Sequence, residues 1–332
     1  MIPVATREEL LDVCARLRAQ YPVIGGGLVD RGLPADDPAW SSAAQALGYV
    51  AARTDDGLAS ELEAFAAVSI DFLRLQARFM LTGRYARTGG AAELVDELYN
   101  DPDKMKGYYL DGLALTYALW PNHARMIRFM TERFLPQLRP GDRVVEVGVG
   151  HGLLSALMFD AQPDLHYVGV DISPSSLDYA GEALARIGVD RERVTMVGAD
   201  AMSGDLVRLG GEDGFDALVC CEVLEHVDRP GVLAAALAAA LAPGRPAFVS
   251  TVANMEAEDH VYLFSDVDDI RQLLAGSGWR VVEDRPHVLP GAEDWQPLPV
   301  NYSAVVTRAD GPAAPPAAAT FAGVSEAHQN AR

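Results

Sequence analysis

Hydrophobic and polar positions follow different periods in the first and second parts of the chain. From Thr6 to Leu135, apolar residues recur every three or four positions. The long segment that begins after Asp56 and stops at Gly83 has the spacing of a helix with one buried face. Thr6 and Glu9 form a capping box in front of another such segment. This region shows no convincing strand pattern, so we expect it to be all-helical.

After Pro140, short apolar runs alternate with helix-length segments, which is typical of a parallel sheet with crossover helices. Helical stretches separate the first five runs, one starting at Pro174 and an alanine-rich one running from Gly231 to Leu241. The pattern predicts an α/β fold with seven strands, at residues 143–148, 166–171, 193–198, 215–221, 246–251, 279–284 and 302–307.

These patterns divide the chain into three parts. Residues 1–105 are expected to form a helical N-terminal domain, which caps the substrate site, forms a dimer interface, or does both. Residues 106–308 hold the α/β domain. Residues 309–332 are rich in Pro, Ala and Gly and poor in large apolar side chains, so we expect a flexible tail.

The stretch VVEVGVGHGL ends the first expected strand and carries Gly148, Gly150 and Gly152. A dinucleotide loop needs the spacing G-x-G-x-x-G, and here the third of those positions is Leu153. S-adenosylmethionine (SAM) has no phosphate and carries a cationic ammonium group. The carboxylate of Glu146 beside the loop would attract that ammonium and repel a pyrophosphate. The loop therefore favours SAM over a nicotinamide dinucleotide. The dinucleotide is the alternative ligand, and binding it would make the protein an oxidoreductase.

Two acidic residues follow the next strands at intervals that suit an adenosyl group. Asp171 ends the second expected strand, where a carboxylate can accept both ribose hydroxyls. Asp200 follows the third and can accept the adenine amino group, with Ile172 and Met202 packing against the ring. Each Asp alone is equally consistent with a helix cap or a turn. Their order behind the glycine loop favours the binding interpretation.

Composition narrows the class of partner. The formal net charge is -20 at pH 7, and only two of the 27 basic residues are lysines, Lys104 and Lys106. This balance argues against nucleic acid or an anionic membrane as partner and favours a small neutral or cationic molecule. The N-terminus lacks an apolar signal region, so we expect a cytoplasmic protein. Cys14, Cys220 and Cys221 form neither a disulfide framework nor a C-x-x-C site, and we expect buried thiols.

The motifs EVGVGHG, GVDIS, GAD and CCEVLEHV, in this order between about Gly141 and Arg308, resemble those of the class I (Rossmann-like) SAM-dependent methyltransferases. The resemblance extends to the ubiquinone-type branch (types 11 and 12) that acts on small molecules. It implies a seven-stranded sheet whose last strand is antiparallel, preceded here by the helical domain. The cofactor-binding residues that it implies are Glu146, Gly148, Gly150, Gly152, Asp171, Ile172, Asp200, Ala201, Cys221 and Glu222.

Candidate catalytic residues come from two segments expected at the carboxyl edge of the sheet. The segment EVLEHVDRP supplies Glu222, Glu225 and His226, and the loop after the fifth strand supplies Asp259 and His260. Methyl transfer from a sulfonium mainly requires alignment and, for a hydroxyl acceptor, removal of a proton. We expect His226, His260 and Glu225 to act in this acid–base or orienting role.

A metal is the alternative use of the same residues. Glu-x-x-Glu-His is similar to the pattern in ubiquinone-type O-methyltransferases and in small-RNA 2′-O-methyltransferases, where it can hold a divalent ion. Glu222, Glu225, His226 and His260 would suit Mg²⁺, Mn²⁺ or Fe²⁺. The pattern also occurs in metal-free members, and we favour the acid–base role over the metal. The charge of -20 disfavours the RNA interpretation.

The acceptor is expected to bind in an aromatic-lined pocket. Tyr108, Tyr109 and Trp120 lie in the run before the first strand and would suit a planar or cationic acceptor, although aromatics at helical spacing also fit a core. We expect O-methylation of a small molecule in secondary or specialised metabolism. N- or C-methylation is the alternative reaction, and a non-catalytic SAM-binding interaction protein the alternative class. The helix after Asp56 could serve a homodimer.

Overall fold

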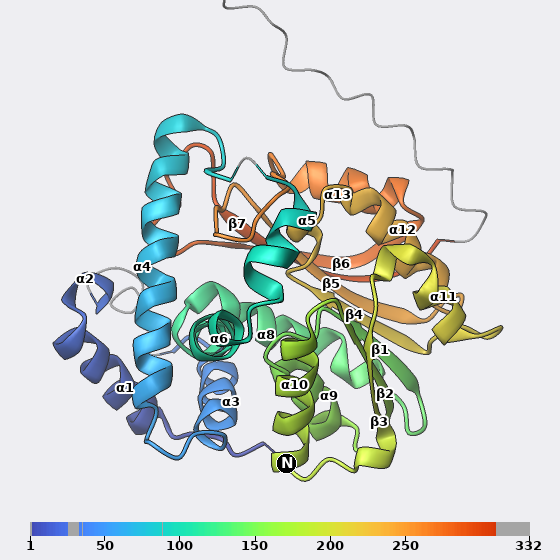
Figure 1. Cartoon of the computed structure of the whole chain (residues 1–332), viewed down its shortest axis with the longest axis horizontal. Coiled ribbons are helices and arrows are strands. Elements are labelled where there is room, and N and C mark those ends of the chain that lie inside the picture. Colours follow the sequence, from blue (N-terminus) through green and yellow to red (C-terminus); the bar gives the residue numbers. More distant parts are fainter. Residues whose placement is uncertain (1, 26–32, 35, 88, 310–332) are drawn as a thin grey trace, which may run out of the picture.

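The computed structural model describes residues 2–25, 33–34, 36–87 and 89–309. A seven-stranded sheet with helices on both faces forms one part of the molecule, and the N-terminal helices gather beside it (Figure 1). The predicted flexible tail lies outside the described residues, except for Ala309.

The sheet confirms the predicted strands and their direction. Its order is β3-β2-β1-β4-β5-β7-β6. The first five strands are parallel, β7 is antiparallel to β5, and β6 is antiparallel to β7. The strands are β1 (Arg143–Val147), β2 (His166–Asp171), β3 (Val194–Gly198), β4 (Ala217–Cys221), β5 (Pro246–Ala253), β6 (Trp279–Val288) and β7 (Val300–Arg308).

Successive side chains of a strand point to opposite faces of the sheet. Val144 of β1 packs in the core on one face, and Val145 packs in the core on the other. Helices α8 to α10 cover the first face and α11 to α13 the second, so the strands read as almost continuous apolar runs. The bounds are α8 (Pro121–Arg133), α9 (Leu153–Ala161), α10 (Pro174–Arg186), α11 (Asp205–Gly210), α12 (Pro230–Ala240) and α13 (Val267–Gly276).

The region before β1 is helical throughout its described residues, as predicted. The capping box of Thr6 and Glu9 is present, and Gly83 ends α4 with a φ of 65°. The helices are α1 (Arg7–Gln20), α2 (Pro22–Ile24), α3 (Trp40–Ala51), α4 (Ala59–Thr82), α5 (Ala91–Leu94), α6 (Pro102–Lys104) and α7 (Asp111–Leu119), with π-helical segments at Val95–Tyr99 and Met105–Leu110. Single 3-10 turns lie at Leu135–Gln137, Arg191–Arg193, Ala201–Ser203 and Leu224–His226.

The N-terminal helices share one hydrophobic core with the first face of the sheet. This core contains Phe65 of α4 as well as Val144 of β1. The Tyr49 hydroxyl of α3 also donates a hydrogen bond to the backbone oxygen of His151, 2.6 Å away, in the loop after β1. The N-terminal region is thus fixed against the glycine loop, and the domain boundary after residue 105 stays a prediction. None of the described helices combines the length and apolar character needed to cross a bilayer.

The cysteines differ in burial. Cys220 and Cys221 are buried at the end of β4, as predicted. Cys14 is only half-buried, so the prediction of a buried thiol is wrong there. On α1 the fully buried positions are taken by Val13 and Leu17, and Cys14 packs at the margin of the core.

Candidate functional site

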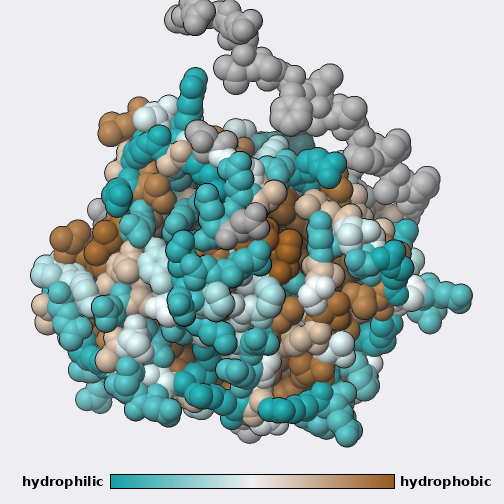
Figure 2. All heavy atoms as spheres, viewed as in Figure 1, coloured by the Kyte–Doolittle hydropathy of each residue, from teal (hydrophilic) through white to brown (hydrophobic). Residues whose placement is uncertain are grey.

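A cavity of about 500 Å³ lies at the carboxyl ends of strands β1 to β5. Its other wall comes from α4, residues 91–109 and α7. Open α/β sheets bind ligands at this place, beside the point where the strand order reverses, here between β1 and β4. Figure 2 shows hydrophobic side chains gathered between the helical segment 91–99 and the sheet, among hydrophilic ones.

The glycine loop forms the floor of the cavity through two of its three glycines. Gly148 and Gly150 line it. Gly148 has a φ of 79°, and a Cβ atom there would collide with the side chain of Val223. Gly152 is not among the lining residues; it begins α9 with a φ of 77°, packed against Ala180 and the Tyr49 hydroxyl. Its positive φ and this close packing both require glycine, and its contact with a cofactor stays a prediction.

Glu146 lies at the back of the cavity, almost fully buried on β1. The Tyr167 hydroxyl donates a hydrogen bond of 2.7 Å to its Oε2 atom. Burial raises the pKa of this carboxyl to about 8, although the bonds from Tyr167 and Ser155 oppose the change. A cationic group that binds in front of this carboxyl would stabilise its ionised form.

The predicted adenosyl residues lie together on one side of the cavity. Asp171 ends β2, and the backbone N–H groups of Ser173 and Gly150 donate to it over 2.8 and 3.4 Å. Burial raises its pKa to about 6, against the effect of those bonds. Asp200 caps the turn after β3 by accepting from Met202 N. The other predicted members of this group, Ile172 and Ala201, also line the cavity.

Cys221 and Glu222 line the cavity at the end of β4. Glu222 has a φ of 53°, a strained conformation for a residue with a side chain. Ser250 Oγ and Asn301 Nδ2 donate to its carboxylate over 2.7 and 2.8 Å. Burial and the nearby Glu225 raise its pKa. Cys221 Sγ lies 2.9 Å from Ser250 Oγ, so the same serine contacts both residues.

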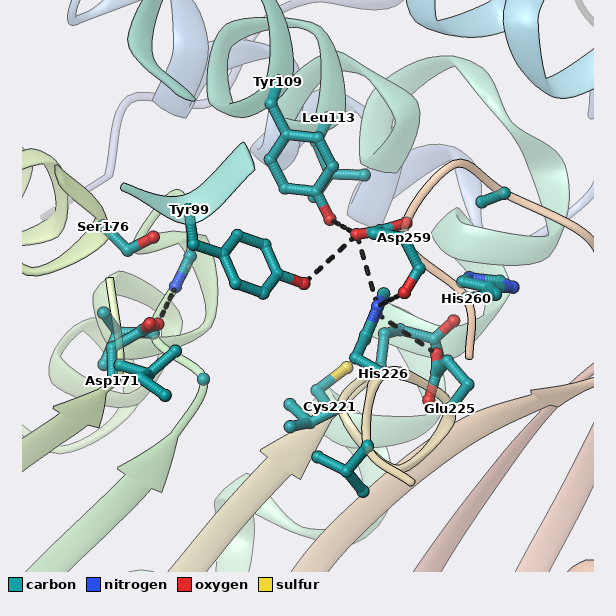
Figure 3. Close-up of a pocket in the computed structure, with 18 of the residues that line it drawn as sticks. Tyr99, Tyr109, Leu113, Asp171, Ser176, Cys221, Glu225, His226, Asp259 and His260 are labelled. Atoms are coloured by element: carbon teal, nitrogen blue, oxygen red, sulfur yellow. Dashed lines mark hydrogen bonds and ion pairs between the residues drawn. The ribbon is translucent and has the colours of Figure 1, made fainter. Parts of the chain in front are cut away.

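His226 is held by the loop after β5. Its Nδ1 atom lies 2.8 Å from the backbone oxygen of Asp259 and 3.3 Å from that residue's carboxylate. Burial alone would lower the pKa of His226, but the charges of Asp259 and Glu225 outweigh burial and raise it. The hydroxyls of Tyr109 and Tyr99 donate to the Asp259 carboxylate from the opposite wall, as Figure 3 shows.

Three of the four residues predicted as metal ligands form one cluster. Glu225, His226 and His260 each offer a ligand atom within 4.8 Å of the others. Glu225 is fully buried; Thr251 donates to its Oε2, and its Oε1 has no hydrogen-bond partner among the described residues. His260 Nδ1 lies 2.7 Å from the backbone oxygen of Met255, which leaves its Nε2 atom available. Glu222 stays outside the cluster.

The residues predicted for the acceptor, Tyr108, Tyr109 and Trp120, all line the cavity. Tyr108 donates to Asp71 over 2.8 Å. The indole ring of Trp120 packs against Phe72 with centroids 4.9 Å apart, and its Nε1–H has no hydrogen-bond partner among the described residues.

Sequence reasoning did not assign Tyr99, His151 or Asn301 to the site, although all three line the cavity. His151 lies between Gly150 and Gly152, and this position in the loop could have indicated that it reaches the site. The Tyr117 and His151 rings meet edge to face at 4.8 Å, and burial lowers the pKa of His151 to about 3, so that its ring is neutral. Tyr99 and Asn301 gave no local signal, because their partners are distant in the sequence.

Comparisons with known proteins agree with this geometry. The family described as "Methyltransferase domain" matches residues 145–244. A ubiquinone biosynthesis O-methyltransferase from Hahella chejuensis is 36% identical over 137 residues, 41% of this chain and 53% of the relative. Its counterpart from Stutzerimonas stutzeri is 30% identical over 136 residues, 40% of this chain and 54% of the relative. The chain thus spans about half the length of these relatives.

Among solved structures, an O-methyltransferase family protein from Burkholderia thailandensis is similar with a TM-score of 0.52 and 13% identity. The similarity covers 78% of this chain and 74% of that protein. At this identity it shows a shared fold.

Proposed function

Because the chain carries a class I, SAM-dependent methyltransferase domain, we propose that it transfers the methyl group of SAM to a hydroxyl group of a small molecule. The observation that carries this proposal is the cluster of two imidazoles and one carboxylate that faces the same cavity as the glycine loop. A hydroxyl acceptor must lose a proton, and this cluster is suited to that task. The similarity to ubiquinone biosynthesis O-methyltransferases supports the same reaction.

The residues on the sheet side fit SAM by their chemistry. SAM supplies a methyl group on a positively charged sulfur, which is already an activated leaving group. Glu146 offers a carboxylate for the ammonium, Asp171 offers one for the ribose hydroxyls, and Asp200 one for the adenine amino group. Gly150 leaves the backbone bare beside them, since a Cβ atom there would meet nothing within 4 Å, and a ligand can therefore approach closely.

On the acceptor side, His226 is the residue that we propose to hold the acceptor hydroxyl and take its proton. Asp259 fixes its Nδ1 atom through two contacts, so the proton is exchanged at Nε2. The Nε2 atom lies 3.9 Å from Glu225 Oε1. Glu225 can therefore stabilise the imidazolium that forms, because a buried carboxylate favours a neighbouring positive charge.

The same three side chains fit a divalent cation. Both imidazoles are bonded at Nδ1 to backbone oxygens, the arrangement in which metal-binding histidines present Nε2. The unpartnered oxygen of Glu225 is a third donor with charge to neutralise. When bound, the cation would lower the pKa of a hydroxyl group beside it. The cluster thus accommodates either a proton on His226 or a divalent ion.

The first test is methyl transfer from deuteromethyl-labelled SAM to a panel of phenols, catechols, amines and keto acids, followed by mass spectrometry. We expect labelled product from phenols or catechols. Label on nitrogen or carbon would replace O-methylation by the alternative reactions. S-adenosylhomocysteine (SAH) binding without product from any acceptor would favour the non-catalytic class. Parallel reactions with a chelator, and with Mg²⁺ or Mn²⁺ restored, decide whether the cation is required.

Cofactor binding is expected to release protons near neutral pH. Glu146 and Asp171 have pKa values of about 8 and about 6 in the free protein, and a nearby cation lowers both. Affinity for SAM should rise with pH from about 6 towards about 8 as both carboxyls ionise, and it should fall again at higher pH once the ammonium of SAM loses its proton. Titration calorimetry at pH 7 in two buffers of different ionisation enthalpy measures the protons released.

Glu146→Gln serves as the matched variant for this experiment, because it removes the ionisation with little change in shape. It should bind SAM more weakly and release fewer protons at pH 7. Proton uptake on binding, or an affinity that falls between pH 6 and 8, would contradict the electrostatic role of Glu146.

A further inference from the structure

Apart from His226, whose pKa is raised, the charged side chains that line the cavity are all of one sign. No lysine or arginine is among the described residues that line it. The histidines His123 and His151 are neutral there, since burial lowers the pKa of each to about 3. Nine lining residues carry a carboxyl group: Asp71, Glu146, Asp171, Asp200, Glu222, Glu225, Asp228, Glu258 and Asp259.

Most of these carboxyl groups have a role in the site described above, but Asp71, Asp228 and Glu258 do not. Asp228 accepts the backbone N–H of Ala91. Asp71 of α4 and Glu258 of the loop after β5 lie where the cavity meets solvent.

The cations that act on Glu258 are Lys104 and Arg87, and neither lines the cavity. Arg87 is paired with Glu97, and Lys104 lies 3.9 Å from Asp101. The outer end of the cavity therefore keeps an unbalanced negative charge.

Arg74 does not neutralise this end. Its guanidinium lies 3.6 Å from Asp71 within the same helix, but the Arg74 side chain is 79% exposed and does not line the cavity. Exposed pairs of this kind contribute little. Asp71 also accepts the hydroxyl of Tyr108, so its carboxylate is fixed beside the cavity wall.

Aromatic rings line the same cavity. Tyr108, Phe72 and Trp120 are among the lining residues, and ring faces attract cations. Trp120 supplies an independent sign that a ligand binds in this cavity, because its Nε1–H is buried and has no partner among the described residues. A buried donor of this kind is normally paired, and an oxygen atom of the acceptor can pair it.

We propose that the acceptor is a hydroxylated aromatic molecule that carries a protonated amine, and that its ammonium binds between Asp71, Glu258 and the ring of Tyr108. The inference rests on the proposed function, since it names the substrate class of the same cavity. An anionic acceptor would bring a carboxylate or phosphate among carboxylates, and the described lining residues include no lysine or arginine to receive it. The cavity therefore selects against anions as well as for cations.

Matched acceptors test this selection. Dopamine, 4-ethylcatechol and 3-(3,4-dihydroxyphenyl)propanoate share one catechol ring and differ at the chain end in a positive charge, no charge and a negative charge. We expect kcat/KM to be about tenfold higher for the ammonium than for the ethyl compound, and at least about 100-fold higher than for the carboxylate. Equal values, or a preference for the carboxylate, would overturn the proposal.

Binding separates this inference from the proposed reaction. Phenethylamine and 3-phenylpropanoate have no hydroxyl group, so neither can be methylated on oxygen. With the full chain loaded with SAH, titration calorimetry should show the ammonium compound binding at least about tenfold more tightly. If it does and no catechol is methylated, the reaction is wrong and the charge selection stands. If the two bind equally, the charge selection is wrong whatever the reaction.

Two variants locate the subsite. Asp71→Asn and Glu258→Gln should each lower the preference for dopamine over 4-ethylcatechol severalfold, through KM more than kcat, because neither carboxylate is a hydrogen-bond or ion-pair partner of Glu225, His226 or His260. Glu63→Gln is the matched control, since Glu63 is exposed on the same helix as Asp71 and does not line the cavity. An unchanged preference in the Asp71→Asn, Glu258→Gln double variant would show that the ammonium does not bind at this position.

Discussion

Replacing His226 by glutamine is expected to lower kcat by about 10²- to 10⁴-fold and to leave SAM affinity unchanged. The residue lies 3.9 Å from Glu225 and is held by Asp259, where we propose that the acceptor binds, whereas Asp171, which we propose to bind the ribose, lies across the cavity (Figure 3). An interaction made only in the transition state lowers kcat and kcat/KM together. Single-turnover kinetics with the best acceptor of the panel, with SAM binding measured by calorimetry, checks both parts.

The contacts of His226 provide matched variants. Asp259→Asn keeps the shape and removes the charge that orients the imidazole, so it should reduce kcat by a smaller factor than His226→Gln. His260→Gln distinguishes proton from metal. If a cation is required, the His226 and His260 variants should both lose bound metal, measured by elemental analysis of protein purified in the presence of Mn²⁺. Full activity of His226→Gln with an intact metal content would exclude His226 from both roles.

Most of the residues predicted for the cofactor line one cavity, and this placement was predictable because their signals are local. Each strand of the sheet is a short apolar run, and the residue that ends it, such as Asp171 or Cys221, reaches the cavity with no help from distant segments. The parallel order brings the carboxyl ends of these strands to one edge. A pattern of strand ends therefore predicts which residues meet, even before the order of the strands is known.

Gly152 shows the limit of such spacing arguments. Three glycines at alternate positions look equivalent in the sequence, yet the chain turns between them. Gly148 and Gly150 line the cavity, whereas Gly152 is the N-cap residue of α9 and packs against Ala180. Which glycine lines the cavity depends on the path of the turn. The hydroxyl of Tyr49, about a hundred residues earlier in the chain, holds that turn through its hydrogen bond to the backbone oxygen of His151.

The acceptor side depends on contacts that no local pattern contains. The carboxylate of Asp259 accepts hydrogen bonds from the hydroxyls of Tyr99 and Tyr109, which are 160 and 150 residues away in the sequence. Glu222 had the same spacing from His226 as known ligands, but Ser250 and Asn301 bind its carboxylate instead. The sequence therefore predicted the residue types of the cluster, and tertiary packing decided which of them converge.

The second large effect is expected from Gly148→Ala. The φ of 79° is costly for alanine, by about 1 to 3 kcal/mol of folding free energy, and the new Cβ atom collides with Val223. Val223 is β-branched and stiff, and it precedes the turn that carries Glu225 and His226. Relief of the collision must therefore move either the glycine loop or the start of that turn. We expect at least about a tenfold loss of SAM affinity together with a lower kcat.

Gly188→Ala separates strain from site geometry. Gly188 has a φ of 84°, lies outside the cavity lining, and a Cβ atom there would meet nothing within 4 Å. Thermal unfolding should show a loss of stability for both variants, larger for Gly148→Ala because of the collision, whereas calorimetry with SAH should show weaker binding only for Gly148→Ala. Unchanged binding in both would mean that Val223 yields without moving the loop, and Gly148 would then be required for the turn alone. Weaker binding in both variants would mean that the loss of SAH affinity comes from general destabilisation, because a Cβ atom at Gly188 meets nothing within 4 Å through which it could act on the cavity.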